Sequence, residues 1–203
     1  ERYLYFVKDD PGSSFWGSVI EPKFPTGMPR WIAENWNELK GCFADRNLGT
    51  ESVSFNAGKL PYGANFGILT EVQKQYPFNS SFGRRGHAVM GEDEFDLFRR
   101  LLIDGHSGAW IPQAKIWHQI PSSRSSPAYV FDYFVGQGRA LVANDKAWHR
   151  DVEKMKAESR SEFYKYKLKR MFMNSKVWVS HMIRSGLARG QWEAMLDLDG
   201  EKF

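Results

Sequence analysis

Cysteine is nearly absent from the sequence: Cys42 is the single cysteine among 203 residues. One cysteine can form neither an internal disulfide nor a zinc site built from cysteine pairs, which favours a protein of a reducing compartment. Long apolar runs are missing too, since no stretch approaches the roughly 18 residues that cross a bilayer. The first residues lack the charged-then-apolar order of a signal peptide. We therefore expect a cytoplasmic protein.

Several catalytic signatures are also missing. The sequence contains neither a phosphate-binding P-loop nor the Gly-x-Ser-x-Gly elbow of many hydrolases. Gly136-Gln-Gly138 lacks the third glycine of a dinucleotide-binding motif, and Cys42 has no obvious histidine partner nearby in the sequence. These absences argue against P-loop nucleotide hydrolysis, hydrolysis through a serine or cysteine nucleophile, and dinucleotide-dependent chemistry.

Aromatic residues, by contrast, are abundant. With 15 Phe, 8 Trp and 8 Tyr and 42% hydrophobic residues, the chain has enough apolar material for a buried core and is not disordered. Charge is uneven, because residues 139–190 contain 13 Lys or Arg and 5 Asp or Glu, a net +8, whereas the remaining 15 basic and 19 acidic residues give −4. A basic tail on a mildly acidic body suggests that the tail faces an anionic partner or surface.

The spacing of apolar residues predicts an α+β fold. The clearest helix covers residues 93–104, with acids in its first turn and Gly105 after its end. Residues 109–120 are predicted to be a strand that is interrupted at Pro112. Near the start of the chain, residues 3–7 form an apolar and β-prone run.

The most informative stretch is Gly91-Glu-Asp-Glu-Phe-Asp-Leu-Phe-Arg-Arg-Leu-Leu-Ile-Asp-Gly105. It places Glu92 and Asp93 at a helix N-terminus, where free backbone N–H groups and the helix dipole keep carboxylates ionised. An ionised carboxylate held there can serve as a general base toward a hydroxyl. Simple helix capping is the alternative role for an acidic first turn.

Other motifs give this stretch a context. In chain order they are Phe15-Trp-Gly-Ser-Val-Ile-Glu-Pro22, Pro61-Tyr-Gly-Ala-Asn65, Tyr76-Pro-Phe-Asn-Ser-Ser-Phe-Gly83, Gly91-Glu-Asp93, Gly105 and Ile111-Pro-Gln-Ala-Lys-Ile-Trp-His118. Their order and spacing resemble the C-terminal, acceptor-side half of family 2 glycosyltransferases, which are inverting enzymes with the GT-A fold. The resemblance covers residues 15–138. It implies transfer of a sugar from a nucleotide-sugar donor to the hydroxyl of a glycan or lipid-linked acceptor.

The resemblance also implies roles for individual residues. Asp93 matches the carboxylate that deprotonates the acceptor hydroxyl, and Glu92 matches its companion. Gly63, Ala64 and Asn65 match a loop beside the donor sugar, and a loop without bulky side chains lets backbone approach a ligand closely. As an alternative, Asn65 could be only a turn former.

Two further positions match weaker features of the family. His118 matches a histidine that in many members joins the shell of the diphosphate or of a divalent metal, Mg²⁺ or Mn²⁺. Arg124 lies where a cation could neutralise a leaving diphosphate. The alternatives are a packed side chain for His118, which ends an apolar run, and a solvated loop residue for Arg124.

The chain also departs from the family pattern. The family's N-terminal half, with a nucleotide-binding βαβ unit and a metal-binding Asp-x-Asp motif, is not visible, because Asp9-Asp10 lacks that spacing. Phe78-Asn79 stands where the family has Phe-Asp. We therefore expect the isolated chain to be inactive. The Gln-x-x-Arg-Trp signature of processive synthases is absent, which favours a non-processive transferase of surface glycan or polysaccharide synthesis.

Two domains are predicted. Residues 1–140 would form the acceptor-side half of a GT-A domain and residues 141–203 a basic amphipathic helical extension, with one helix over residues 164–183. That helix could pack on its own domain, lie on an anionic membrane surface, or bind single-stranded nucleic acid. Of the two binding functions we favour the inner face of a membrane and expect no nucleic acid. The alternative to an enzyme is a non-catalytic carbohydrate- or partner-binding module.

Overall fold

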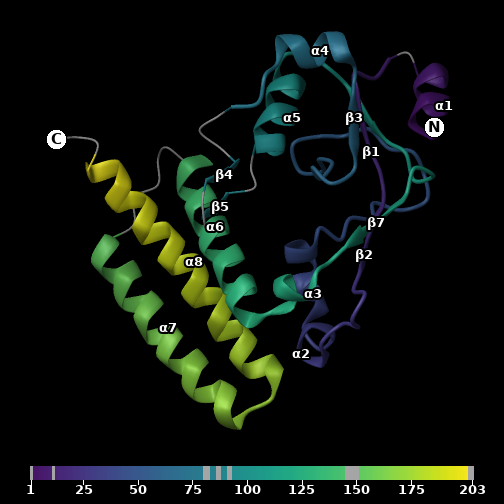
Figure 1. The fold of residues 1–203 in the computed structure, drawn as a ribbon. Coiled ribbons are helices and arrows are strands. Elements are labelled where there is room, and N and C mark those ends of the chain that lie inside the picture. Colours follow the sequence, from purple (N-terminus) through teal and green to yellow (C-terminus); the bar gives the residue numbers. More distant parts are fainter. Residues whose placement is uncertain are drawn as a thin grey trace. The chain divides into compact units, whose positions relative to one another are not determined.

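The computed structural model of the protein describes residues 2–10, 12–79, 83–85, 88–90, 93–144 and 151–200. Its helices and small mixed sheets make it an α+β protein, as predicted (Figure 1). The chain divides into two compact units, each built from separate segments. The first unit comprises Glu1–Pro25, Lys40–Phe82 and Glu92–Ile120, and the second comprises Thr26–Leu39, Gly83–Gly91 and Pro121–Phe203.

Two small sheets form the framework of the first unit. Strand β1 (Phe15–Gly17) pairs antiparallel with β3 (Phe66–Ile68) and parallel with β6 (Gly108–Trp110), so that Phe15 lies opposite Ile68 on one side and Gly108 on the other. Strand β2 (Ile20–Lys23) pairs parallel with β7 (Ile116–Gln119). The predicted strand over residues 109–120 is thus two strands, because the chain turns between them at Pro112, where the interruption was predicted.

The core of the first unit lies between the β1 sheet and helix α5 (Asp93–Ile103). Phe15 is fully buried and stacks on Phe98 of α5, with ring centroids 5.0 Å apart. A Cβ on Gly108 would lie 2.3 Å from the Phe15 ring, so only glycine lets the ring pack against this strand. The helix predicted over residues 93–104 is confirmed. The short helices α4 (Thr70–Gln75) and η1 (Lys40–Phe43) complete the unit.

The first segment of the chain is helical, which corrects the β-prone interpretation of residues 3–7. Helix α1 spans Arg2–Asp9. Tyr3, Phe6 and Val7 pack on a buried cluster that contains Trp16, whereas the intervening Leu4 and Tyr5 are mostly exposed. The composition of the run favours a strand, but a spacing of three and four residues buries one face of a helix.

The second unit is mainly a three-helix assembly. Helix α8 (Ser175–Gly200) packs along both α6 (Pro127–Asn144) and α7 (Val152–Phe172), and the three helices lie side by side in Figure 1. The other elements are α2 (Arg30–Ala33), α3 (Trp36–Leu39), η2 (Ser122–Ser125), and the antiparallel strands β4 (Gly83–Arg85) and β5 (Ala88–Met90). The predicted domain boundary at residue 140 falls inside α6. No helix in the described part of the chain is long and apolar enough to cross a membrane.

The single helix predicted over residues 164–183 is wrong. Helix α7 ends at Phe172, Met173 is extended with φ −123° and ψ 161°, and α8 begins at Ser175. Ser175 is buried, and its hydroxyl accepts a hydrogen bond from Asn35 Nδ2 at 3.0 Å and donates one to the Glu34 carboxylate. These tertiary contacts fix the start of α8, so the chain reverses and forms a helix hairpin.

Close packing of α6 on α8 explains several glycines. A Cβ on Gly190 would lie 1.9 Å from the Val135 carbonyl oxygen, and one on Gly138 would lie 2.2 Å from the Leu187 carbonyl oxygen. Only glycine allows two helix backbones to approach so closely. Gly136-Gln-Gly138 therefore lies within a packed helix and is not a phosphate-binding loop.

Candidate functional site

The acidic start of α5 lies against the glycine loop that the sequence singles out separately. The Gly63 backbone N–H donates a hydrogen bond to Glu94 Oε1 at 3.2 Å. A Cβ on Gly63 would lie 2.6 Å from the same oxygen, so the approach depends on glycine. Gly63 and Ala64 are exposed, which leaves the loop open to a ligand. Two predicted segments about 30 residues apart in the chain thus meet at one place in the first unit.

Asn65 holds this loop in position. Its Nδ2 donates hydrogen bonds to the carbonyl oxygens of Val19 at 3.0 Å and Ala114 at 2.9 Å. Its Oδ1 accepts one from the Tyr3 hydroxyl at 2.9 Å. Asn65 is also buried. The side chain therefore ties the loop to α1 and to the segments that follow β1 and β6, and its contribution to a ligand site is to position Gly63 and Ala64.

An arginine that sequence reasoning missed lies beside the loop. The Arg46 guanidinium sits 4.7 Å from the centre of the Tyr62 ring, and its Nη2 donates to the Leu60 carbonyl oxygen at 2.6 Å. The Tyr62 ring packs edge-on against Phe95 of α5. Among the described residues, the buried Arg46 Nε finds no hydrogen-bond partner. The Arg46 guanidinium therefore lies over a ring that in turn packs against the first turn of α5.

The two acids at the start of α5 interact electrostatically. Burial and, after it, a hydrogen bond with the Asp93 carboxyl raise the pKa of Glu94 to about 7, while the Gly63 N–H acts in the opposite direction. Two carboxylates this close resist simultaneous ionisation. Below about pH 7 the Glu94 carboxyl therefore keeps a proton, which it shares with Asp93 through their hydrogen bond. Sequence reasoning assigned Asp93 and missed Glu94, and the predicted companion Glu92 lies outside the described residues.

The remaining predicted residues belong to other elements than the acidic pair. His118 is half-buried on β7, opposite Pro22 of β2. No three His, Cys, Asp or Glu side chains of the described residues gather as a metal site, so His118 lacks the companions that Mg²⁺ or Mn²⁺ would need within this part of the chain. Arg124 belongs to the second unit, in η2, with its guanidinium 5.8 Å from the Tyr129 ring centre. Cys42 is buried, and burial raises the pKa of its thiol, so it is not a poised nucleophile.

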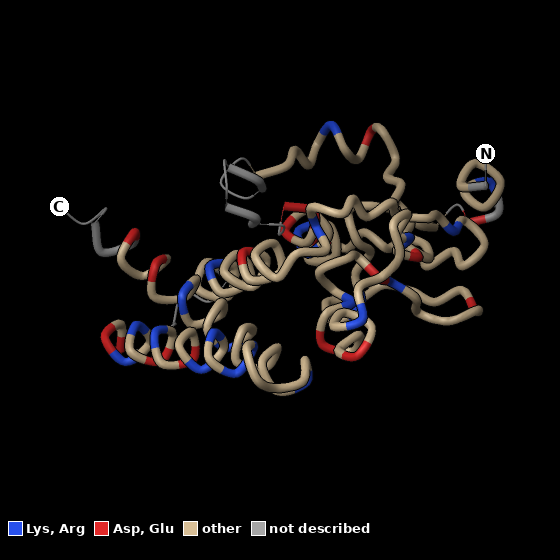
Figure 2. The backbone as a smooth tube through the Cα atoms, turned by 60° about the horizontal axis from the view of Figure 1, so that its bottom comes forward, with Lys and Arg blue, Asp and Glu red and all other residues tan. Residues whose placement is uncertain are grey.

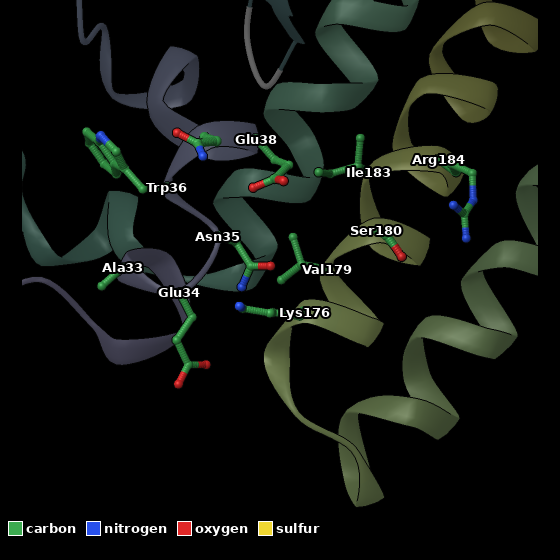
Figure 3. Close-up of a pocket in the computed structure, with 11 residues that line it drawn as sticks. Ala33, Glu34, Asn35, Trp36, Glu38, Lys176, Val179, Ser180, Ile183 and Arg184 are labelled. Atoms are coloured by element: carbon green, nitrogen blue, oxygen red, sulfur yellow. The ribbon is translucent and has the colours of Figure 1, made fainter.

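The second unit has a polar hollow of about 490 Å³ between α8 and the α2–α3 segment (Figure 3). Glu38 and Asn35 point into the gap in that view, and Lys176 reaches toward them from α8. Hydrogen bonds from Ser175 and Arg30 hold the pKa of Glu34, at the edge of the hollow, below its usual value. Carboxylate, amide and ammonium groups together suit a small polar ligand with several hydroxyl groups.

Comparison with known proteins gives no match to a family model, to a curated protein or to a solved structure. What the chain does must therefore be argued from the geometry of its own residues.

Proposed function

We propose that the chain carries the acceptor-side half of an inverting, non-processive glycosyltransferase of the GT-A type. The observation that carries this proposal is the contact between the exposed Gly63 loop and the first turn of α5, where Gly63 N–H donates to Glu94 beside Asp93. Exposed backbone at Gly63 and Ala64 next to a carboxylate base is what a sugar ring and an attacking hydroxyl require. The expected substrates are a nucleotide-sugar donor and a glycan or lipid-linked acceptor.

Asp93 is the proposed general base. The acceptor oxygen attacks the anomeric carbon while its proton passes to Asp93, and the bond from that carbon to the diphosphate oxygen breaks. The electron pair leaves with the nucleoside diphosphate, so a single displacement inverts the configuration. Glu94, when protonated below about pH 7, donates a hydrogen bond to Asp93 and orients it toward the acceptor.

The proposed mechanism assigns no step to a metal. His118 is at most one ligand of a divalent ion whose other ligands lie elsewhere, and such an ion would neutralise the diphosphate when bound. The mechanism likewise assigns no step to Arg124, which was predicted to contact the diphosphate. The residues of this chain act on the acceptor side, by proton transfer at Asp93 and by the close approach that Gly63 permits.

A second candidate function is a binding module without catalysis. The polar hollow beside α8 favours it, because its carboxylate, amide and ammonium groups can bind a glycan without any reacting centre. Release of nucleoside diphosphate separates the two functions. Glycan binding with no turnover of any nucleotide-sugar would support the module and contradict the enzyme.

The test uses the full-length polypeptide that contains this chain, with a panel of nucleotide-sugars and oligosaccharide acceptors. Asp93→Asn keeps shape but removes basicity, so kcat should fall about 10²–10⁴-fold with the donor KM nearly unchanged. Asp96→Asn is the matched control on the same helix, since Asp96 is paired with Arg100 at 2.9 Å. Near-normal turnover of a folded Asp93→Asn variant would reduce Asp93 to a helix cap.

A further inference from the structure

Helix α7 leaves a row of large apolar side chains exposed. Tyr164, Leu168, Met171 and Phe172 are 73%, 62%, 74% and 77% exposed, and their spacing places them on one side of the helix. The buried residues of α7 occupy the opposite side, and they are Met155, Ser159, Glu162 and Tyr166. We call the exposed row, together with Met173, the α7 outer face.

The outer face continues onto the tip of the helix hairpin. Met171, Phe172 and Met173 are consecutive, and even the least exposed of them, Met173, is 51% exposed. They lie where α7 ends and the chain has not yet entered α8. Three exposed apolar side chains in a row are unfavourable in water, and such patches mark interaction sites. We call these three consecutive exposed side chains the apolar wedge.

Positive charge accompanies this wedge. Residues 163–172 contain four Lys or Arg and no Asp or Glu, and Lys176 follows the turn. Lys and Arg recur along α7 in Figure 2. Lys165 is paired with Glu162 at 2.8 Å, whereas Lys167 lies over the rings of Phe163 and Tyr166 and exposes its charge beside the row. An apolar row flanked by cations suits a surface that has an apolar interior and an anionic outer layer.

We propose that the α7 outer face binds the surface of a membrane containing anionic lipid, with the tip inserted between the headgroups. A second copy of the chain is a poorer occupant, because pairing two outer faces would bring like charges together. This proposal does not rest on the proposed sugar transfer, so either can fail alone.

A neighbouring hollow of about 430 Å³ fits the same occupant. It shares Tyr164 with the outer face, and its lining combines the rings of Phe131, Phe163 and Trp192 with Arg160. Arg189 also lines the hollow, where it pairs with Glu193 at 2.7 Å. A lipid acyl chain can lie against the rings while the lipid phosphate contacts the Arg160 guanidinium. The hollow therefore extends the apolar contact beyond the wedge itself.

Liposome flotation of the full chain tests the proposal, with vesicles of phosphatidylcholine alone and of phosphatidylcholine mixed with phosphatidylserine. We expect binding to the mixed vesicles only, weakened by high salt. Phe172→Ser should lower the partition coefficient about 10-fold or more, since it removes one inserted apolar side chain. Lys167→Gln should lower it about 5-fold. The matched control is Leu196→Ser, which removes a 46% exposed apolar side chain from α8 and should bind like the wild type.

Other outcomes overturn the proposal. They are equal binding to neutral and anionic vesicles, no binding to either, or a folded Phe172→Ser variant that floats like the wild type. A dimer in solution that Phe172→Ser dissociates would assign the outer face to a second copy instead. Circular dichroism of each variant shows whether its helices have formed, so that loss of binding is not confused with loss of folding.

Discussion

Replacing Glu94 by glutamine tests the proton that Glu94 shares with Asp93. Glutamine has nearly the same size, its oxygen can accept the hydrogen bond from the Gly63 N–H, and its amide can donate to Asp93. It differs from Glu94 in one respect, because it does not ionise. The substitution therefore keeps the contacts of the protonated wild type and removes its pH dependence.

The expected effect follows from the raised pKa. Burial and the neighbouring Asp93 raise the pKa of Glu94 from 4.5 to about 7, so the folded state binds this proton more tightly than the unfolded chain does. The resulting stability is complete below about pH 4.5 and is lost as pH rises through about 7. The full difference corresponds to about 3 kcal/mol, which solvent screening of the partly exposed carboxyl reduces to about 1–2 kcal/mol.

Urea unfolding followed by tryptophan fluorescence, between about pH 5 and pH 8, measures this effect. We expect Glu94→Gln to match the wild type at pH 5 and to exceed its free energy of unfolding by about 1–2 kcal/mol at pH 8. Glu51→Gln, at an exposed position, is the matched control and should follow the wild type throughout. Parallel pH profiles for Glu94→Gln and the wild type, or a less stable variant at pH 8, would refute the shared proton.

Two glycine substitutions test close contacts, one in each unit. Gly63→Ala should push the Glu94 carboxyl away, because the new Cβ would lie 2.6 Å from Oε1, and should cost about 1 kcal/mol of unfolding free energy. Its control is Gly58→Ala, whose Cβ meets an ordinary 3.5 Å contact, and equal stability of the two variants would contradict the Gly63 contact. Gly190→Ala should destabilise the second unit by about 2–4 kcal/mol in thermal or urea unfolding, because its Cβ would meet the Val135 carbonyl oxygen at 1.9 Å. A Gly190→Ala variant as stable as the wild type would mean that α6 and α8 lie farther apart.

Local signals were sufficient to predict α5 and the break between β6 and β7. The apolar spacing of α5 and the acids in its first turn act within the helix itself. Pro112 has no backbone N–H to donate to a neighbouring strand, so it interrupts the strand. The end of α7 could not be predicted in this way. Its sequence continues the helical pattern into α8, and the break is fixed by contacts of Ser175 with Asn35, 140 residues away.

The candidate site was predicted in part. A glycine before Asn65 and acids at the start of an apolar helix are visible as motifs, so the Gly63 loop and Asp93 could be named from the sequence. Glu94 could not, because its role depends on which side of the first turn of α5 faces the loop. Arg46 follows no periodic pattern and reaches Tyr62 only through the fold. Glu94 and Arg46 are distinguished by their contacts in the folded chain and not by their residue types.

Residues 3–7, whose structure was predicted wrongly, also support the loop. As a strand, the run from Tyr3 to Val7 would point alternate side chains to opposite faces. As helix α1, it packs Tyr3, Phe6 and Val7 on the cluster of Trp16 and brings the Tyr3 hydroxyl to 2.9 Å from Asn65 Oδ1. Burial raises the pKa of Tyr3, so this hydroxyl stays protonated and remains a donor. The position of the Gly63 loop therefore depends on α1 as well as on its own sequence, and the loop motif alone could not have given that position.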